Sequence, residues 1–181
     1  MRKIVDSHLH ISNWGKEDFI SYFDDYVEKE KISSLNICAI PTRQSNVCNN
    51  IMLGFYKLAR PNTYVHGGIE FIEIPIDNMP KDMDAVTQYK ELMEMGFDGI
   101  KMLEGKPTQH KRIGKNLNHP SLNALYKEME KDGGHMLMHV NDPDEFWDLD
   151  RAPGWAVDNG WTYADGTYSS YEEIQRQAIK I

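Results

Sequence analysis

Two histidines near the start of the chain have the spacing of a metal-binding pair. The segment from Asp6 to His10 has the sequence DSHLH and follows the apolar residues Ile4 and Val5. Because side chains alternate along a strand, His8 and His10 should share one face with Asp6 at the end of that strand. Two neutral imidazoles on one face form half of a zinc, iron or manganese site. The pair therefore predicts a metal centre, and two histidines that merely share a face are the alternative.

Two further side chains with useful chemistry belong to later apolar runs. His135, Leu137 and His139 share a face of a predicted strand, and only His139 lies at its outlet. His139 is a candidate third ligand, with a buried histidine bonded to a backbone carbonyl as the alternative. Lys101 closes another apolar run, and its ammonium needs a polar environment, which the mouth of a barrel near a metal would provide.

An alternating series of strands and helices has to position these side chains. Apolar or β-branched runs predict strands at Ile4-Val5, Leu35 to Ile40, Tyr64 to Phe71, Gly99 to Leu103 and Met136 to Val140. The segments between them carry helical stripes, which are Phe19, Phe23, Tyr26 and Val27; Ile51, Phe55 and Leu58; Met83, Val86 and Met93; and Leu122, Leu125 and Met129. Pro120 predicts the start of the fourth helix, Gly133 its end, and Ser170 with Glu173 the start of a fifth.

This alternating order forces parallel strands, which leaves a barrel or a doubly wound sheet. A barrel collects reactive side chains from the ends of many strands, as expected for His8, His10, Lys101 and His139. No glycine-rich dinucleotide-binding turn follows the first strand. We therefore predict an α/β fold of the (β/α)8 TIM-barrel type. Eight units need about 250 residues, so we expect residues 1–181 to be a single partial barrel domain, truncated after about five βα units.

The composition limits the partners. The 181 residues carry a net charge of −8 and 40% of them are apolar, which suits one core and offers no positive field for nucleic acid or an anionic membrane. No apolar run reaches signal-peptide or membrane-spanning length, and the two cysteines suit a reducing compartment. We expect a soluble, cytoplasmic protein that acts on a small-molecule substrate, with a homo-oligomer left open.

The sequence resembles the amidohydrolase superfamily, in particular its amidohydrolase-related metal-dependent barrel hydrolases. The resemblance covers the whole chain and rests on Asp6-x-His8-x-His10, on the stretch GIKML from Gly99 to Leu103, and on His139. It implies that His8, His10 and His139 bind a divalent metal, zinc being the first expectation, as one or two ions. The family also uses a sixth-strand histidine and an eighth-strand aspartate, which takes the proton from metal-bound water. Both would lie beyond Ile181, so the catalytic residue is unknown.

Lys101 is open to three interpretations. It could be a carboxylated lysine that bridges two metals, as in some members of the family, and on that ground it is a candidate metal ligand. It could instead be an ammonium that binds a substrate carboxylate. The third interpretation is a structural lysine paired with an acid such as Asp6.

Three residues are candidates for substrate binding. Glu104 ends the fourth apolar run, Arg112 belongs to the basic, acid-free loop 105–118, and Trp14 follows the first strand. The loop could attract an anionic substrate or simply be solvated. The other tryptophans fall in the long connection 141–169, where they either wall a substrate pocket or form the small core of the loop itself.

These residues predict a metal-dependent hydrolase that acts on a C–N or C–O bond of a small molecule through metal-activated water. Decarboxylases and other lyases use the same kind of site, so they remain an alternative. A phosphoesterase of the polymerase-and-histidinol-phosphatase type also begins with Asp-x-His-x-His, and Glu70 could be its third-strand glutamate. Those phosphoesterases have an Asp-His-Gly motif after the second strand, where this chain has the residues from Ala39 to Arg43. TatD-type deoxyribonucleases share the barrel, but their Gly-Glu-hydrophobic-Gly motif is missing from this chain. A truncated fragment that binds metal without catalysis is the non-enzymatic alternative.

Overall fold

The protein forms a mixed α/β structure around one parallel sheet. The computed structural model describes residues 4–10, 19–41, 46–70 and 84–181. Its strands are β1 (Ile4–His10), β2 (Ile32–Cys38), β3 (Tyr64–Gly68), β4 (Gly99–Gly105) and β5 (His135–Val140). Each strand pairs in parallel with the next one along the chain. The five predicted strands are thus confirmed. Phe71 and Met83, from the predicted third strand and third helix, lie outside the described residues.

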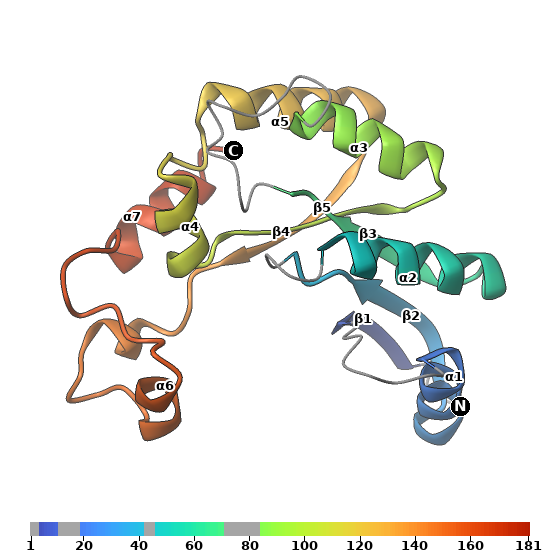
Figure 1. Ribbon diagram of the computed structural model, residues 1–181, viewed down its shortest axis with the longest axis horizontal. Helices are drawn as coiled ribbons and strands as arrows, with labels where there is room; N and C mark the ends of the chain where they lie inside the picture. Colours follow the sequence, from blue (N-terminus) through green and yellow to red (C-terminus); the bar gives the residue numbers. More distant parts are fainter. Residues whose placement is uncertain (1–3, 11–18, 42–45, 71–83) are drawn as a thin grey trace.

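The strand order decides between the two predicted architectures. A doubly wound sheet reverses its order at a switch point, whereas the order here is β1-β2-β3-β4-β5 without reversal. The sheet is curled into a half-barrel, and helices α1, α2, α3 and α5 line its outer side (Figure 1). This architecture is consistent with part of a (β/α) barrel. The closed, eight-stranded form stays a prediction.

The helices fill the connections between the strands. They are α1 (Phe19–Glu30), α2 (Asn46–Ala59), α3 (Ala85–Glu94), α4 (Pro107–Ile113) and α5 (Pro120–Asp132) before β5, and the 3-10 helix η3 (Asp144–Trp147), α6 (Gly154–Asp158) and α7 (Tyr171–Ala178) after it. Within the described segments, none of the helices has both the length and the apolar character that a membrane span requires.

Local sequence signals explain where two of these helices begin and end. Pro120 occupies the first turn of α5, where its missing N–H breaks no helical hydrogen bond. Gly133 ends α5 with a φ of 67°, a left-handed conformation that glycine adopts without strain. The Ser170 side chain caps α7 by accepting a hydrogen bond from the backbone N–H of Glu173. The predicted boundaries of α5 and the predicted start of α7 are therefore confirmed.

Two apolar cores stabilise the fold. The main core lies between the sheet and its helices and includes Ile37, Val65, Ile100 and Met102 from the strands and Phe23, Leu53, Tyr89 and Leu125 from the helices. A smaller core forms within the long connection after β5, from Phe146, Ala156 and Tyr163 with Trp147 and Tyr168 against them. Trp147 therefore takes part in the loop's own core, which is one of the two predicted roles. Trp155 and Trp161 are exposed.

The predicted buried face of α2 is wrong. Ile51, Phe55 and Leu58 are 50%, 61% and 79% exposed, whereas Leu53 and Tyr56 are buried. Both sets of residues recur with helical spacing, so the periodicity alone could not choose between them. The packing of α2 against β3 decides which face of the helix is buried.

Two leucines of α2 test this assignment. Replacing Leu53 by alanine should lower the free energy of unfolding by about 3 kcal/mol, because it leaves a cavity in the main core. Leu58→Ala makes the same chemical change on the exposed face and should alter the free energy by less than about 0.5 kcal/mol. Urea denaturation of both variants measures the difference. A larger loss for Leu58→Ala would mean that α2 buries the face predicted from its sequence.

Candidate functional site

The two N-terminal histidines lie side by side at the end of β1. The ring centroids of His8 and His10 are 4.7 Å apart, and the ring planes make an angle of 68°. The pairing of β1 with β2 is irregular between Asp6 and Leu9. The carboxylate of Asp6 accepts hydrogen bonds from the Tyr26 hydroxyl of α1 at 2.8 Å and from the backbone N–H of His8 at 3.1 Å. The prediction of one regular strand face from Asp6 to His10 is therefore wrong, because the irregularity breaks the alternation.

The protonation state of both rings is suited to metal binding. The Nδ1 of His10 lies 3.3 Å from the carbonyl oxygen of Cys38, which can only accept, so Nδ1 carries the proton and Nε2 keeps a lone pair. Burial and the charge of Lys101 lower the pKa of His10. Burial, Lys101 and His139 lower the pKa of His8. Both imidazoles are therefore neutral near pH 7, which is the form that binds metals.

Lys101 approaches the pair from β4. Its Nζ lies 3.1 Å from Nε2 of His8, and the residue is only 1% exposed. Because β4 continues beyond Lys101, the residue lies within its strand and not at the predicted end. Burial lowers the pKa of Lys101, while the charges of Cys38 and Glu104 act in the opposite direction. Among the described residues it forms no ion pair with a carboxylate, so the predicted pairing with Asp6 is not seen.

His139 lies near the end of β5 and has a different partner. Its Nε2 is 3.1 Å from Oδ1 of Asp142, and its side chain is 31% exposed. The charge of His139 contributes to the lowered pKa of His8, which places the two rings in one electrostatic environment. The structure thus brings His8, His10 and Lys101 together, and His139 acts on His8 through its charge.

Asp142 is a residue of this region that the sequence analysis missed. Its carboxylate accepts hydrogen bonds from Lys106, His139 and the hydroxyl of Tyr163, and its side chain is 7% exposed. Burial would raise the pKa of Asp142, but the three donors outweigh burial and hold it at about 2. Lys106 and Tyr163 are 36 and 21 residues away in the sequence, so no local pattern could reveal these contacts.

A histidine on β3 was also missed by the sequence analysis. The Nδ1 of His66 is 2.7 Å from Oδ1 of Asn36, whose amide donates to the carbonyl of Ser7 at 2.8 Å. Its ring lies against Gly99, where a Cβ atom would come within 2.8 Å of the ring. Burial lowers the pKa of His66. These contacts link four neighbouring strands, β1 to β4, and they indicate a structural role for His66.

Glu104 is buried and not open to a substrate. It is 2% exposed, and within the part of the chain that the structure describes its Oε2 has no hydrogen-bond partner. Burial raises the pKa of Glu104 to about 7, against the opposing effect of backbone N–H groups. Its charge also contributes to a raised pKa of Tyr126 on α5. A substrate could reach Glu104 only after a rearrangement, so its role in substrate binding stays a prediction.

Because of Glu104, the free energy of unfolding should fall as the pH rises from about 5 to 7. An unfolded glutamate has a pKa of about 4.3, whereas the folded value is about 7, so the folded state binds more protons between them. Between these two pH values we expect the wild type to lose on the order of 1 to 3 kcal/mol more than Glu104→Gln. Urea denaturation at both values measures this, with the exposed Glu172→Gln as a control that should follow the wild type. An unchanged pH dependence in Glu104→Gln would contradict the assignment.

The two other predicted substrate-binding residues are Trp14 and Arg112. Trp14 lies outside the described residues. Arg112 is exposed on α4, where Nη1 lies 3.4 Å from Oε1 of Gln109 in the same helix. Its role in binding a substrate therefore stays a prediction.

Two lysines of the basic loop 105–118 contact aromatic rings of the long connection 141–169, which is called the aromatic loop below. The Nζ of Lys106 lies 4.6 Å from the ring centroid of Trp161, and the Nζ of Lys111 lies 4.1 Å from that of Tyr168. Cations over aromatic faces at these distances attract the ring electrostatically. The segment predicted as an anion-attracting or solvated loop thus contains the short helix α4 and anchors the connection after β5.

The described residues offer two neighbouring imidazole donors, His8 and His10, but no complete set of metal ligands. Residues 4–10, 19–41, 46–70 and 84–181 contain no group of three or more His, Cys, Asp or Glu side chains placed to hold a metal ion. The lone pair on Nε2 of His10 is suited to a metal that accepts imidazole, such as zinc. The Nε2 of His8 faces Lys101, so this nitrogen could bind a metal only if the amine is neutral or moves away. The chemistry of the donors therefore fits a divalent metal at the two neighbouring histidines.

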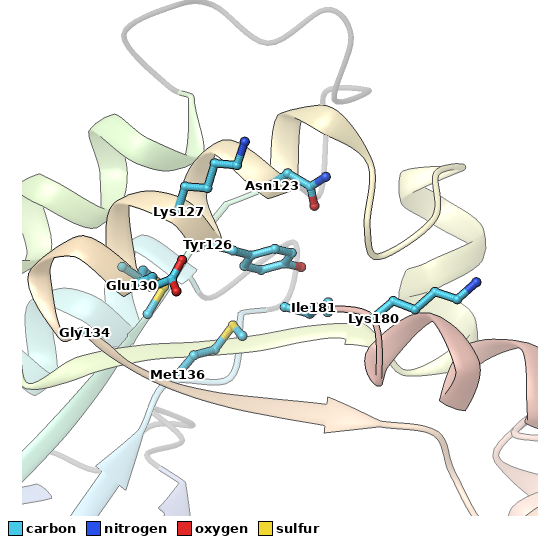
Figure 2. Close-up of a pocket in the computed structure, with 9 residues that line it drawn as sticks. Asn123, Tyr126, Lys127, Glu130, Gly134, Met136, Lys180 and Ile181 are labelled. Carbon is cyan, nitrogen blue, oxygen red and sulfur yellow. The ribbon is translucent and has the colours of Figure 1, made fainter.

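A cavity of about 550 Å³ lies apart from these residues. It is an open pocket beside α5, the start of β5 and the residues after α7 (Figure 2), and its lining consists of Asn123, Tyr126, Lys127, Met129, Glu130, Gly134, Met136, Lys180 and Ile181. None of the histidines of the candidate site lines it. The cavity and the candidate metal centre are separate features of the fold.

Comparison with known proteins adds no relative. No family model matches the chain, and no curated protein or solved structure is significantly similar to it.

Proposed function

We propose that this protein is a metal-dependent hydrolase of the amidohydrolase kind that cleaves a C–N or C–O bond of a small molecule. The observation that supports this most is the meeting of two neutral imidazoles, His8 and His10, with the buried Lys101. The histidines lie at the carboxyl end of the first strand of a curled parallel sheet. Enzymes built on (β/α)8 barrels have their active sites at that end, and we propose that the sheet is part of such a barrel.

Each residue of the site has a distinct proposed role. His10 would bind the metal through Nε2, because its Nδ1 is engaged by the carbonyl of Cys38. His8 would be the second ligand and His139 the third, with zinc as the first candidate metal. When bound, the metal supplies Lewis acidity and activates water near neutral pH.

Lys101 keeps two proposed roles. As a neutral amine beside His8, it could add to carbon dioxide, lose a proton and form a carbamate that would be a further metal ligand. As an ammonium, it would orient a substrate carboxylate or carbonyl next to the histidines. Its burial favours either role over that of a solvated surface lysine, because a buried amine needs a specific partner.

Metal analysis combined with an activity screen tests the proposal. The purified chain is stripped with a chelator, reloaded with Zn²⁺ and assayed on small amides, lactones and aromatic carboxylates. We expect Zn²⁺ to bind, and we expect any hydrolysis that the chain supports to need the metal and to fall by at least about 100-fold in Lys101→Met. Lys29→Met, which changes an exposed lysine near the end of α1, should keep the activity of the wild type.

The outcomes separate the competing functions. Zinc binding with release of carbon dioxide from the aromatic carboxylates would favour a lyase over a hydrolase. Zinc binding without any turnover would contradict an enzymatic function of this chain and favour a metal-binding role. Turnover that is equal with and without metal would contradict the metal-dependent mechanism altogether.

A further inference from the structure

The carboxylate of Asp142 joins three separate segments of the chain. Its Oδ1 lies 3.1 Å from Nε2 of His139 at the end of β5 and 2.8 Å from Nζ of Lys106 after β4. Its Oδ2 lies 2.6 Å from the same Nζ and accepts a hydrogen bond from the hydroxyl of Tyr163 in the aromatic loop. Both oxygens are therefore occupied by donors.

This arrangement determines which nitrogen of His139 carries a proton. An ionised carboxylate can only accept hydrogen bonds, so Nε2 of His139 must be the donor. In the neutral ring the lone pair is then on Nδ1. The ammonium of Lys106 lies within hydrogen-bond distance of both oxygens and so favours the ionised carboxylate.

We propose that Asp142 is a positioning residue that fixes His139 as the Nε2–H tautomer and leaves Nδ1 as its only nitrogen able to bind a metal or a substrate proton. The same carboxylate also accepts hydrogen bonds from Lys106 and Tyr163, so it connects these two residues to the tautomer of His139. Carboxylates that hold the second nitrogen of a metal-binding histidine orient the ring in this way. The part of the inference that concerns metal binding rests on the proposed function, whereas the tautomer does not.

The occupation of both oxygens argues against two simpler roles. A general base needs a free lone pair directed at the substrate, and here the donors Lys106, His139 and Tyr163 already engage the carboxylate. An ion pair with Lys106 alone would satisfy the charge of Asp142 and would not require the contact with His139. The contact with the histidine is thus the feature that a positioning role explains.

Nitrogen-15 NMR of the histidine rings in the full, metal-free chain tests the proposal directly. We expect the Nε2–H tautomer of His139 in the wild type above pH 7. In Asp142→Asn the amide can donate to the ring, so the Nδ1–H tautomer should become populated. Tyr163→Phe is the matched control, because it removes a donor to the same carboxylate and leaves the contact with His139, and it should keep the Nε2–H tautomer.

A zinc titration forms the second arm of the experiment. Asp142→Asn should bind Zn²⁺ about 10- to 100-fold more weakly than the wild type, and Tyr163→Phe should remain within a few fold of it. An Nδ1–H tautomer in the wild type, or an unchanged tautomer in Asp142→Asn, would overturn the positioning role. The wild-type spectrum decides this even if Asp142→Asn does not fold. If the wild type binds no Zn²⁺ but shows the expected tautomer, the proposed function fails and the positioning role stands.

Discussion

Replacing His10 by alanine is expected to weaken Zn²⁺ binding by at least about 100-fold, while the free energy of unfolding changes by less than about 1 kcal/mol. His10 offers Nε2 to the metal and is only partly buried, so the scaffold should remain packed without it. A catalytic metal site on a packed scaffold contributes little to folding, in contrast to a small domain that folds around its zinc. Calorimetric titration with Zn²⁺ and urea denaturation measure the two quantities.

A second histidine provides the matched control. His135 starts β5, is exposed and has no proposed role in metal binding. His135→Ala should therefore keep the Zn²⁺ affinity of the wild type. Equal losses in the two variants would show non-specific binding by histidines, and an unchanged affinity in His10→Ala would exclude His10 as a ligand.

Gly105→Ala is expected to destabilise the protein by about 3 kcal/mol and to weaken Zn²⁺ binding as well. A Cβ atom at Gly105 would lie 2.2 Å from the carbonyl oxygen of His139, closer than any real contact, so β4 and β5 would have to separate. That separation moves His139 and also Lys106, which follows Gly105 directly. Urea denaturation and a zinc titration measure both effects.

Gly154→Ala is the control for this variant. A Cβ atom at Gly154, in the first turn of α6, would meet nothing within 4 Å, so its effect should stay below about 0.5 kcal/mol. If Gly105→Ala were as stable as Gly154→Ala, the close approach of β4 and β5 at this point would be wrong.

The order of the elements could be predicted from the sequence because it depends on local signals. Runs such as Gly99 to Leu103 are apolar and bounded by loops, and Pro120 and Gly133 act through their own backbone geometry. The face of α2 could not be predicted in this way. That helix carries apolar residues on two sides, and only its position on the sheet determines that Leu53 is buried and Leu58 is exposed.

The candidate site was predictable in its residue types but less so in its geometry. The sequence DSHLH indicated a pair of adjacent imidazoles, and His8 and His10 are adjacent. The irregular pairing after Asp6 depends on the register against β2, which no pattern within β1 reveals. The contacts of Asp142 with Lys106 and Tyr163 are likewise tertiary, so a local motif could not assign them.

X-ray absorption spectroscopy of the zinc-loaded chain tests the central claim most directly. We expect imidazole nitrogens to bind the metal at about 2.0 to 2.1 Å, and we expect the histidine scattering pattern to be lost in a variant with both His8→Ala and His10→Ala. A zinc ion surrounded only by oxygen atoms, or a spectrum that the double substitution leaves unchanged, would contradict it.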